Sequence, residues 1–404
     1  MQAAVNLAFP EQSGRKKGTL AESELARAPR CPLQVDWRGN MKLNSWVGGM
    51  LLLMAGWAPL SRLQMLAGEV PGASGYTVLA PIRHGNLTVF PVVAAKSHET
   101  DGFLTLDEGL KSGDVIVTES GSVGPLVRPR HPHDPAYRPG GGAQVNQLVL
   151  VNNSKRPLIL LAGEIVTGGK QDRVIAKDRI VPAESDPIDL GVFCVEPGRW
   201  TGVSSKFGYS GGVMVQPGVR AKAMADKDQA KVWAEVGKAK EAVAAGPSAP
   251  TSYEFNSTTS YARVMQNDEV KKQLDSVAAP IAQNYESLIK QLRDRNAVGV
   301  VVAVNGEIVW SDIFASTQLL QKYWPKLIRS YAAEAVLTHA NGREVSLKAA
   351  QQFLDDMGGR HETIESEPGL YRHTEVAGDG FRAFELTSLL PKTGFDVHVA
   401  KMAE

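Results

Sequence analysis

Alternating apolar and polar residues predict short β-strands over most of the first half of the chain. Residues 76–82 and 87–93 flank a turn that contains glycine, and residues 148–151 and 158–161 flank a second polar turn, so each pair predicts an antiparallel hairpin. Residues 188–196 form an apolar run of the length expected for a buried strand. The first half is therefore expected to be rich in antiparallel β-structure.

Helical spacing of apolar residues replaces this alternation in the middle of the chain. Helices are expected at residues 220–245, 268–292, 317–337 and 347–357. Because proline lacks a backbone N–H, Pro280 should kink or split the second of these helices and Pro325 should interrupt the third. Strands are expected again at residues 298–304, 307–314, 361–366, 370–376, 381–386 and 395–400.

These patterns predict an α+β protein with a β-rich first half of antiparallel hairpins, a helical middle and an α+β C-terminal part. The expected divisions are an N-terminal extension (1–40), a signal peptide (41–68), a β-rich lobe that carries the central motif (74–216), a helical segment (217–296) with a linker at 246–259, and an α+β lobe (297–402).

The segment that begins at Met41 has the layout of a secretory signal. Lys42 is followed by the apolar run 47–60, which is shorter than the ~20 residues of a membrane-spanning helix, and then by the small residues Ala67 and Gly68. We expect translation to begin at Met41 and the protein to be exported, periplasmic or secreted, without a stable membrane span after signal removal. A membrane anchor formed by residues 47–60 is the alternative.

The charges of the 404-residue chain balance, with 44 Lys and Arg against 43 Asp and Glu and a formal net charge of +1. No global field attracts polyanions, so nucleic acid is not expected as a partner. Cys31 lies in the N-terminal extension, which leaves Cys194 as the single cysteine of the mature protein and excludes an intrachain disulfide. The oligomeric state stays open.

Residues 161–200 concentrate most of the candidate chemistry. Glu164 and Glu196 each follow an apolar strand and are candidates for a catalytic acid or base. Between them, a glycine pair permits a sharp turn whose backbone N–H groups and neighbouring cations could hold an anionic or polar ligand. The candidate ligand-binding residues are Gly168, Gly169, Lys170, Gln171, Arg173 and Arg199.

Cys194 and Glu196 alternate with Phe193 and Val195 along the strand, so they share one face with Val192. A thiol in that position fits a small core residue better than a nucleophile, because no histidine is close in sequence to activate it. Glu196 lies where the strand ends and needs a cation, which Arg199 can supply.

Two other motifs do not carry chemistry. The run GEIVTGGKQ differs from a phosphate-binding P-loop, because Glu164 replaces its first glycine and Gln171 replaces the magnesium-binding Ser or Thr. His131 and His133 stand in a proline-rich loop that is expected to stay solvated, so no metal site and no cofactor are expected.

The blocks GEIVTGGKQDR and CVEPGRW resemble those of the ARG and Rhodanese-Phosphatase-superfamily-associated Protein domain family. The resemblance extends from Gly85 to about Tyr331 and implies an enzymatic or effector role in a bacterial and archaeal family. The residues that match the family blocks are Glu164, Gly168, Gly169, Gln171, Arg173, Cys194, Glu196, Arg199 and Trp200.

Three interpretations of these residues remain open. The first is an exported enzyme that uses Glu164 and Glu196 for proton transfer on a small polar or anionic ligand. The second is a non-catalytic module that binds a ligand or partner with the same residues, and the third is a structural Glu–Arg network with no site. The first requires both glutamates to reach one accessible cleft.

Overall fold

The computed structural model of the chain describes residues 70–71, 75–122, 142–245, 250–292, 295–338 and 340–404. All of them belong to one compact unit of the chain, residues 63–404. Antiparallel strands dominate its first half, helices its middle, and both types its C-terminal part, which confirms the predicted α+β class. The predicted signal and the segment 1–40 lie outside the described residues.

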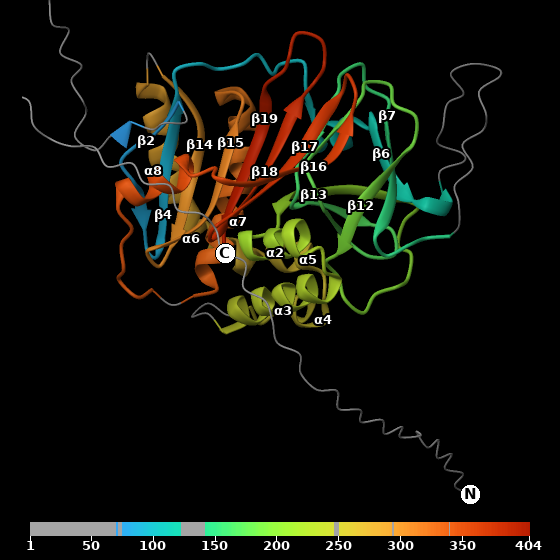
Figure 1. Cartoon of the computed structure of the whole chain (residues 1–404). Coiled ribbons are helices and arrows are strands. Elements are labelled where there is room, and N and C mark those ends of the chain that lie inside the picture. Colours follow the sequence, from blue (N-terminus) through green and yellow to red (C-terminus); the bar gives the residue numbers. More distant parts are fainter. Residues whose placement is uncertain (1–69, 72–74, 123–141, 246–249, 293–294, 339) are drawn as a thin grey trace, which may run out of the picture. The chain divides into compact units, whose positions relative to one another are not determined.

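A ten-stranded antiparallel sheet combines strands from both ends of the unit (Figure 1). The hairpin of the first half meets that of the second half directly, because Phe90 in β4 pairs with Val301 in β14. The strand order is β1 (Val70–Pro71), β2 (Tyr76–Val78), β4 (Leu87–Ala94), β14 (Asn296–Val304), β15 (Glu307–Phe314), β19 (Asp396–Ala403), β18 (Phe381–Ser388), β17 (Tyr371–Gly378) and β16 (Gly359–Glu367), with β3 (Ile82–His84) also paired to β4.

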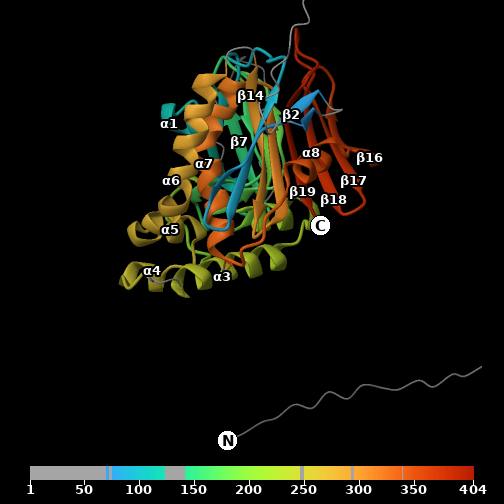
Figure 2. The same ribbon diagram turned by 90° about the vertical axis from the view of Figure 1, so that its left-hand side faces the viewer.

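Helices cover both faces of this sheet (Figure 2). Along β14, Val300 and Val302 pack in one hydrophobic cluster with α6 (Asp268–Gln291) and α7 (Thr317–Val336). The alternate residues Val301 and Ala303 pack in another cluster with α8 (Leu347–Asp355). Burial on both faces explains why β14 is almost entirely apolar.

Six strands of the first half close into a barrel. Around the barrel the order is β10 (Arg173–Ile175), β12 (Ile188–Cys194), β7 (Gln147–Asn152), β6 (Val115–Glu119), β13 (Lys206–Met214) and β9 (Glu164–Gly168). Its core contains at least one apolar side chain from each strand, among them Val117, Leu150, Val166, Ile175, Val192 and Phe207. Side chains therefore fill the middle of the barrel, as expected for so few strands.

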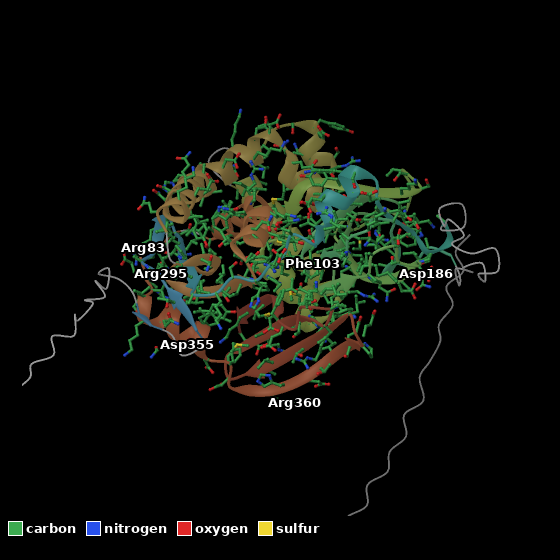
Figure 3. All side chains as sticks on the ribbon, turned by 90° about the horizontal axis from the view of Figure 1, so that it is seen from above. Arg83, Phe103, Asp186, Arg295, Asp355 and Arg360 are labelled. Atoms are coloured by element: carbon green, nitrogen blue, oxygen red, sulfur yellow. The ribbon has the colours of Figure 1, made fainter. Side chains whose placement is uncertain are left out.

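A small three-stranded sheet lies beside the barrel and joins it to the rest of the unit. It consists of β11 (Arg179–Val181), β8 (Leu158–Leu160) and β5 (Leu104–Thr105), and α1 (Leu106–Ser112) follows β5 behind a capping box formed by Thr105 and Glu108. Phe103 packs with Ile159 of β8 and Tyr323 of α7 in the largest hydrophobic cluster. Seen from above, Phe103 lies near the middle of the unit (Figure 3).

Among the described residues, four helices and a π-helical turn connect the barrel to α6. They are α2 (Pro217–Ala221), the π-helical turn η3 (Lys222–Asp226), α3 (Gln229–Ala245), α4 (Tyr253–Ser257) and α5 (Tyr261–Gln266). A 3-10 turn, η1 (Ser120–Ser122), follows β6. Within the predicted linker 246–259, the part that the structure describes contains α4.

Both prolines lie inside continuous helices. The predicted interruption of the third helix is wrong, because α7 runs from Thr317 to Val336 through Pro325, and α6 likewise continues through Pro280. A proline removes one backbone hydrogen bond, and burial of the flanking side chains outweighs that loss. Tyr323, Trp324 and Leu327 around Pro325 are each at most 4% exposed.

The direction of the barrel strands determines which residues share a mouth. Because neighbouring strands are antiparallel, the C-terminal ends of β6, β9 and β12 meet the N-terminal ends of β7, β10 and β13. Glu119, Gly168 and Cys194 therefore lie at one mouth with Arg173, and we call this end the upper mouth. Glu164, the first residue of β9, lies at the opposite mouth.

Candidate functional site

The turn between β9 and β10 can form only with glycine at its first two positions. Gly168 has φ 123° and Gly169 has φ 51°, both in the region that other residues rarely adopt. A Cβ atom on Gly169 would lie 2.2 Å from Cζ of Phe207, and one on Gly168 would lie 2.7 Å from Oγ of Ser204. The glycine pair thus allows the loop to pack closely against the start of β13.

Glu196 and Arg199 meet this loop, as the sequence predicts. Oε2 of Glu196 accepts a hydrogen bond from the N–H of Asp172 at 3.0 Å and lies 2.5 Å from Nη2 of Arg199. Arg199 also donates to the carbonyl oxygens of Gly168 and Gly169, at 3.3 and 3.1 Å. These contacts join the end of β12 to the loop and occupy most of the donors of Arg199.

Three backbone N–H groups of the loop are bonded to oxygens of the protein itself. The N–H of Gly168 donates to Oδ1 of Asp172 at 2.9 Å, and the N–H of Lys170 donates to Oε1 of Glu119 at 2.8 Å. The N–H of Gly169 donates to Oγ of Ser204 at 3.2 Å. Glycine backbone at these positions therefore shapes the loop, and these three N–H groups are already used within the protein.

Asp172 links the loop to the helical part of the unit. Its Oδ2 accepts a hydrogen bond from Oγ of Ser260, the N-cap residue of α5, at 2.5 Å. Burial raises the pKa of Asp172, even though the bonds from Ser260 and Gly168 favour its charged form. The acidic residue at the centre of the loop is thus a structural acceptor.

Glu164 lies in a separate cluster at the opposite mouth of the barrel, which we call the lower mouth. Its Oε2 accepts a hydrogen bond from the N–H of Leu161 at 2.7 Å, and its Oε1 lies 2.5 Å from Nζ of Lys326, which also contacts Asp107 at 2.8 Å. Glu164 is 1% exposed, and burial raises its pKa. The length of β9 separates it from the loop by about 13 Å.

The structure therefore does not bring the two predicted catalytic glutamates together. Glu164 and Glu196 lie at opposite mouths and share no hydrogen-bond partner among the described residues. A sequence cannot show this, because both residues sit at strand ends next to apolar runs and only the strand directions distinguish them.

Arg173 is the buried cation of the upper mouth. Strand alternation places it on the same side of β10 as Ile175, in the barrel interior, and it is 0% exposed. Nη1 donates to the carbonyl of Gln171 at 2.8 Å, whereas Nε and Nη2 have no partner among the described residues. Burial lowers the pKa of Arg173, opposed by the nearby Cys194 and Glu119.

Further polar groups without a partner surround Arg173. Oε2 of Glu119 and Oε1 of Gln171 are buried without a hydrogen bond from any described residue, and the two side chains are 6% and 5% exposed. Trp200, 43% exposed, covers the cluster from outside, with its ring centre 5.8 Å from Cζ of Arg173 and 4.9 Å from Nζ of Lys170. We call Glu119, Lys170, Gln171, Arg173 and Trp200 the mouth cluster.

A family comparison covers both the barrel and the ten-stranded sheet. The model of the ARG and Rhodanese-Phosphatase-superfamily-associated Protein domain, ARPP-1, matches residues 75–401. The chain belongs to the ARPP-1 family. No curated protein and no solved structure shows a significant match to it. The mouth cluster and the cluster of Glu164, Lys326 and Asp107 at the opposite mouth both lie inside the matched ARPP-1 region.

Cys194 occupies a core position in this ARPP-1 domain. It is 0% exposed, it pairs with Arg173 across β10 and β12, and its Sγ accepts the N–H of Glu196 at 3.4 Å. Burial raises the pKa of the thiol, which disfavours the reactive thiolate. The position therefore fits the core interpretation.

A second ionic cluster of the ARPP-1 domain has no signal in the sequence. Arg220 forms a two-pronged ion pair with Asp312, both bonds at 2.8 Å, and His398 lies 2.5 Å from Asp178 and 3.1 Å from Asp312. The hydroxyl of Tyr331 donates to Asp312. We call these five residues the buried charge network, because each is 0% exposed. They come from distant segments and show no motif spacing, so no local pattern could reveal them.

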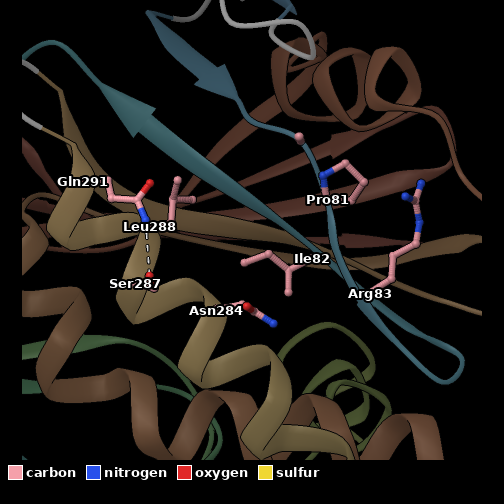
Figure 4. Close-up of a pocket in the computed structure, with 8 residues that line it drawn as sticks. Pro81, Ile82, Arg83, Asn284, Ser287, Leu288 and Gln291 are labelled. Carbon is pink, nitrogen blue, oxygen red and sulfur yellow. Dashed lines mark hydrogen bonds between the residues drawn. The ribbon is translucent and has the colours of Figure 1, made fainter.

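A surface groove of the ARPP-1 domain lies apart from all predicted site residues (Figure 4). It has a volume of about 450 Å³ between β3 and α6 and is lined by Ala80, Pro81, Ile82, Arg83, Asn284, Ser287, Leu288 and Gln291. Among the described residues, no cluster of side chains has the composition of a metal site. No described helix is both long and apolar enough to cross a membrane.

Proposed function

We propose that this ARPP-1 protein is a ligand-binding module whose mouth cluster captures a small molecule with an anionic group. The proposal rests on Arg173, whose guanidinium is fully buried. No described residue accepts a hydrogen bond from its Nε or Nη2. A buried guanidinium with donors that form no hydrogen bond is costly, so proteins seldom keep one without a use.

The two free donors have the geometry that an anion requires. Nε and Nη2 lie on the same edge of the planar guanidinium, so together they can donate two parallel hydrogen bonds to a carboxylate or a phosphate. Lys170 adds a second cation near the outer side, beside the ring of Trp200. An anionic group that passes Trp200 would therefore meet one cation at the entrance and another inside.

The same geometry favours binding over proton transfer. Glu196 is held by Arg199 and by the N–H of Asp172, and Glu164 lies at the opposite mouth with Lys326. Oε2 of Glu196 and both oxygens of Glu164 are thus engaged by groups of the protein itself. The proposed roles of Lys170, Gln171 and Arg173 in ligand binding are retained, whereas Gly168, Gly169 and Arg199 are proposed to shape the loop.

Thermal shift assays of the full-length chain with sodium phosphate, acetate and propionate test the proposal. At least one of these anions should raise the melting temperature. Arg173→Met should abolish the increase, and a cooperative melting transition in buffer shows that the variant folds. Arg329→Met is the matched control, since Arg329 pairs with Asp275 on the surface. A wild-type protein that responds to no anion, or an Arg173→Met variant that responds fully, would refute the proposal.

We also propose that the protein is exported through the segment that begins at Met41. Support comes from Lys42, the apolar run 47–60 and the small residues that follow it. Expression in a bacterial host, followed by cell fractionation and intact-mass measurement, should give a shortened soluble product outside the cytoplasm. A full-length product in the membrane fraction would instead support an anchor, and a full-length product in the cytoplasm would contradict export.

A further inference from the structure

The unpaired acceptors beside Arg173 narrow the class of ligand more than the requirement for a negative charge does. Oε1 of Glu119 is used by the N–H of Lys170, but Oε2 is buried and has no partner among the described residues. Gln171 donates through Nε2 to the carbonyl of Glu196 at 3.1 Å, which fixes the amide so that Oε1 is left as a free acceptor. The mouth cluster thus presents two donors on one side chain and two acceptors on two others.

These groups form no hydrogen bond with one another. Nε and Nη2 of Arg173 do not bond to Oε2 of Glu119, although both residues lie at the upper mouth and the charge of Glu119 acts on Arg173. A buried carboxylate oxygen and a buried guanidinium edge that do not meet each leave an uncompensated polar atom. A single ligand that carries both an acceptor and a donor would compensate both.

We propose that the ligand is a zwitterion of the α-amino-acid type, with its carboxylate on Arg173 and its ammonium group between Glu119 and Gln171. This inference rests on the proposed function and specifies its ligand class. The carboxylate takes the Nε–Nη2 edge, and the ammonium group, which has three donors, takes Oε2 of Glu119 and Oε1 of Gln171. A simple anion leaves both acceptors unpaired, whereas a hydroxy acid offers them one neutral donor.

Three ligands of nearly the same shape separate these cases. L-Alanine, L-lactate and propionate share the carboxylate and the methyl group but present an ammonium group, a hydroxyl and a hydrogen atom. Calorimetric titration of the full-length chain should rank them in that order. Alanine should bind at least about ten to a hundred times more tightly than propionate, the range expected from the charged hydrogen bond to Glu119 alone.

Glu119→Gln tests the role of the carboxylate. Glutamine keeps a carbonyl oxygen for the N–H of Lys170, so the loop contact survives, and the preference for alanine over propionate should fall at least fivefold. Glu362→Gln is the control, because Glu362 is an exposed residue paired with Arg360 on β16. That variant should keep the wild-type preference.

The outcomes distinguish this inference from the proposed function. Propionate that binds as tightly as alanine, with binding lost in Arg173→Met, would overturn the zwitterion and leave anion binding in place. Binding of none of the three ligands, together with no response to phosphate, would overturn both. The ranking on the unaltered chain decides the question even if Glu119→Gln fails to fold.

Discussion

Asp312→Asn tests most directly how much the buried charge network contributes to the free energy of unfolding. The substitution keeps the shape of the side chain but removes the negative charge that faces Nη1 and Nη2 of Arg220, each at 2.8 Å, and Nε2 of His398 at 3.1 Å. Since Arg220 and Asp312 are both 0% exposed, water cannot replace the lost charge. The variant retains a buried guanidinium without a carboxylate.

Breaking a buried ion pair from one side typically costs about 3–5 kcal/mol. For a folded unit of this size, 1 kcal/mol lowers the melting temperature by about 2 °C, so a decrease of roughly 6–10 °C is expected. Urea unfolding followed by circular dichroism gives the free energy of unfolding from the midpoint and the slope. The slope should stay at the wild-type value, because the variant changes the stability and not the surface exposed on unfolding.

Asp275→Asn is the matched control for this measurement. Asp275 forms a similar two-pronged pair with Arg329, at 2.9 and 3.2 Å, but the two side chains are 42% and 48% exposed. Its loss should cost less than about 1 kcal/mol. If Asp312→Asn costs no more than Asp275→Asn, the network does not stabilise the fold in the way described.

Three further predictions follow from the same geometry. Burial acts against the charged form of His398, but Asp178 and Asp312 raise its pKa to about 9. The charged imidazole therefore contributes fully to the free energy of unfolding below pH 6.5, and this contribution is lost as the pH rises through 9. Up to about 3 kcal/mol should disappear over this window, and His398→Gln should flatten the urea midpoint measured against pH. Glu164→Gln should lower the free energy of unfolding by about 1–3 kcal/mol, because an amide has one oxygen and cannot replace both carboxylate oxygens that face Leu161 and Lys326. The variant should keep the anion-induced thermal shift, and loss of that shift would contradict the placement of the ligand at the upper mouth. Gly169→Ala should lower the free energy of unfolding in urea by about 2–4 kcal/mol, because the position has a positive φ and the new Cβ would clash with Phe207. Gly198→Ala is the control and should cost about 1 kcal/mol, because its φ is 88° but no atom lies within 4 Å of its Cβ. Equal losses would show that the contact with Phe207 is unimportant.

The local parts of the fold could be predicted from the sequence. Hairpins and helices follow from apolar periodicity over ten to twenty residues, and the junction of Glu196 and Arg199 with the glycine loop follows from strands that end close together. The continuity of α7 through Pro325 could not be predicted, because it depends on the burial of Tyr323, Trp324 and Leu327 by distant segments.

The candidate site could be predicted only in part. Gln171 stands in the glycine loop and Arg173 begins the strand after it, but Glu119 lies some fifty positions earlier. The only signal of Glu119 is an acidic residue that ends the apolar strand β6. Glu164 was expected beside Glu196, and the expectation fails because the five residues of β9 span the barrel from one mouth to the other. Side-chain direction at a strand end depends on the closure of the barrel, which no local pattern encodes.

The position of β4 in the ten-stranded sheet has a consequence for synthesis on the ribosome. All eight residues of β4 are buried, yet its inner neighbour β14 follows roughly two hundred residues later, which takes about 10–40 s at ordinary translation rates. The barrel, in contrast, contains only strands that lie between β4 and β14 in the sequence. It can therefore close before β14 has been synthesised and has paired with β4. Until β14 emerges, an apolar segment close to the start of the unit needs protection from aggregation, by a chaperone or by an early partner.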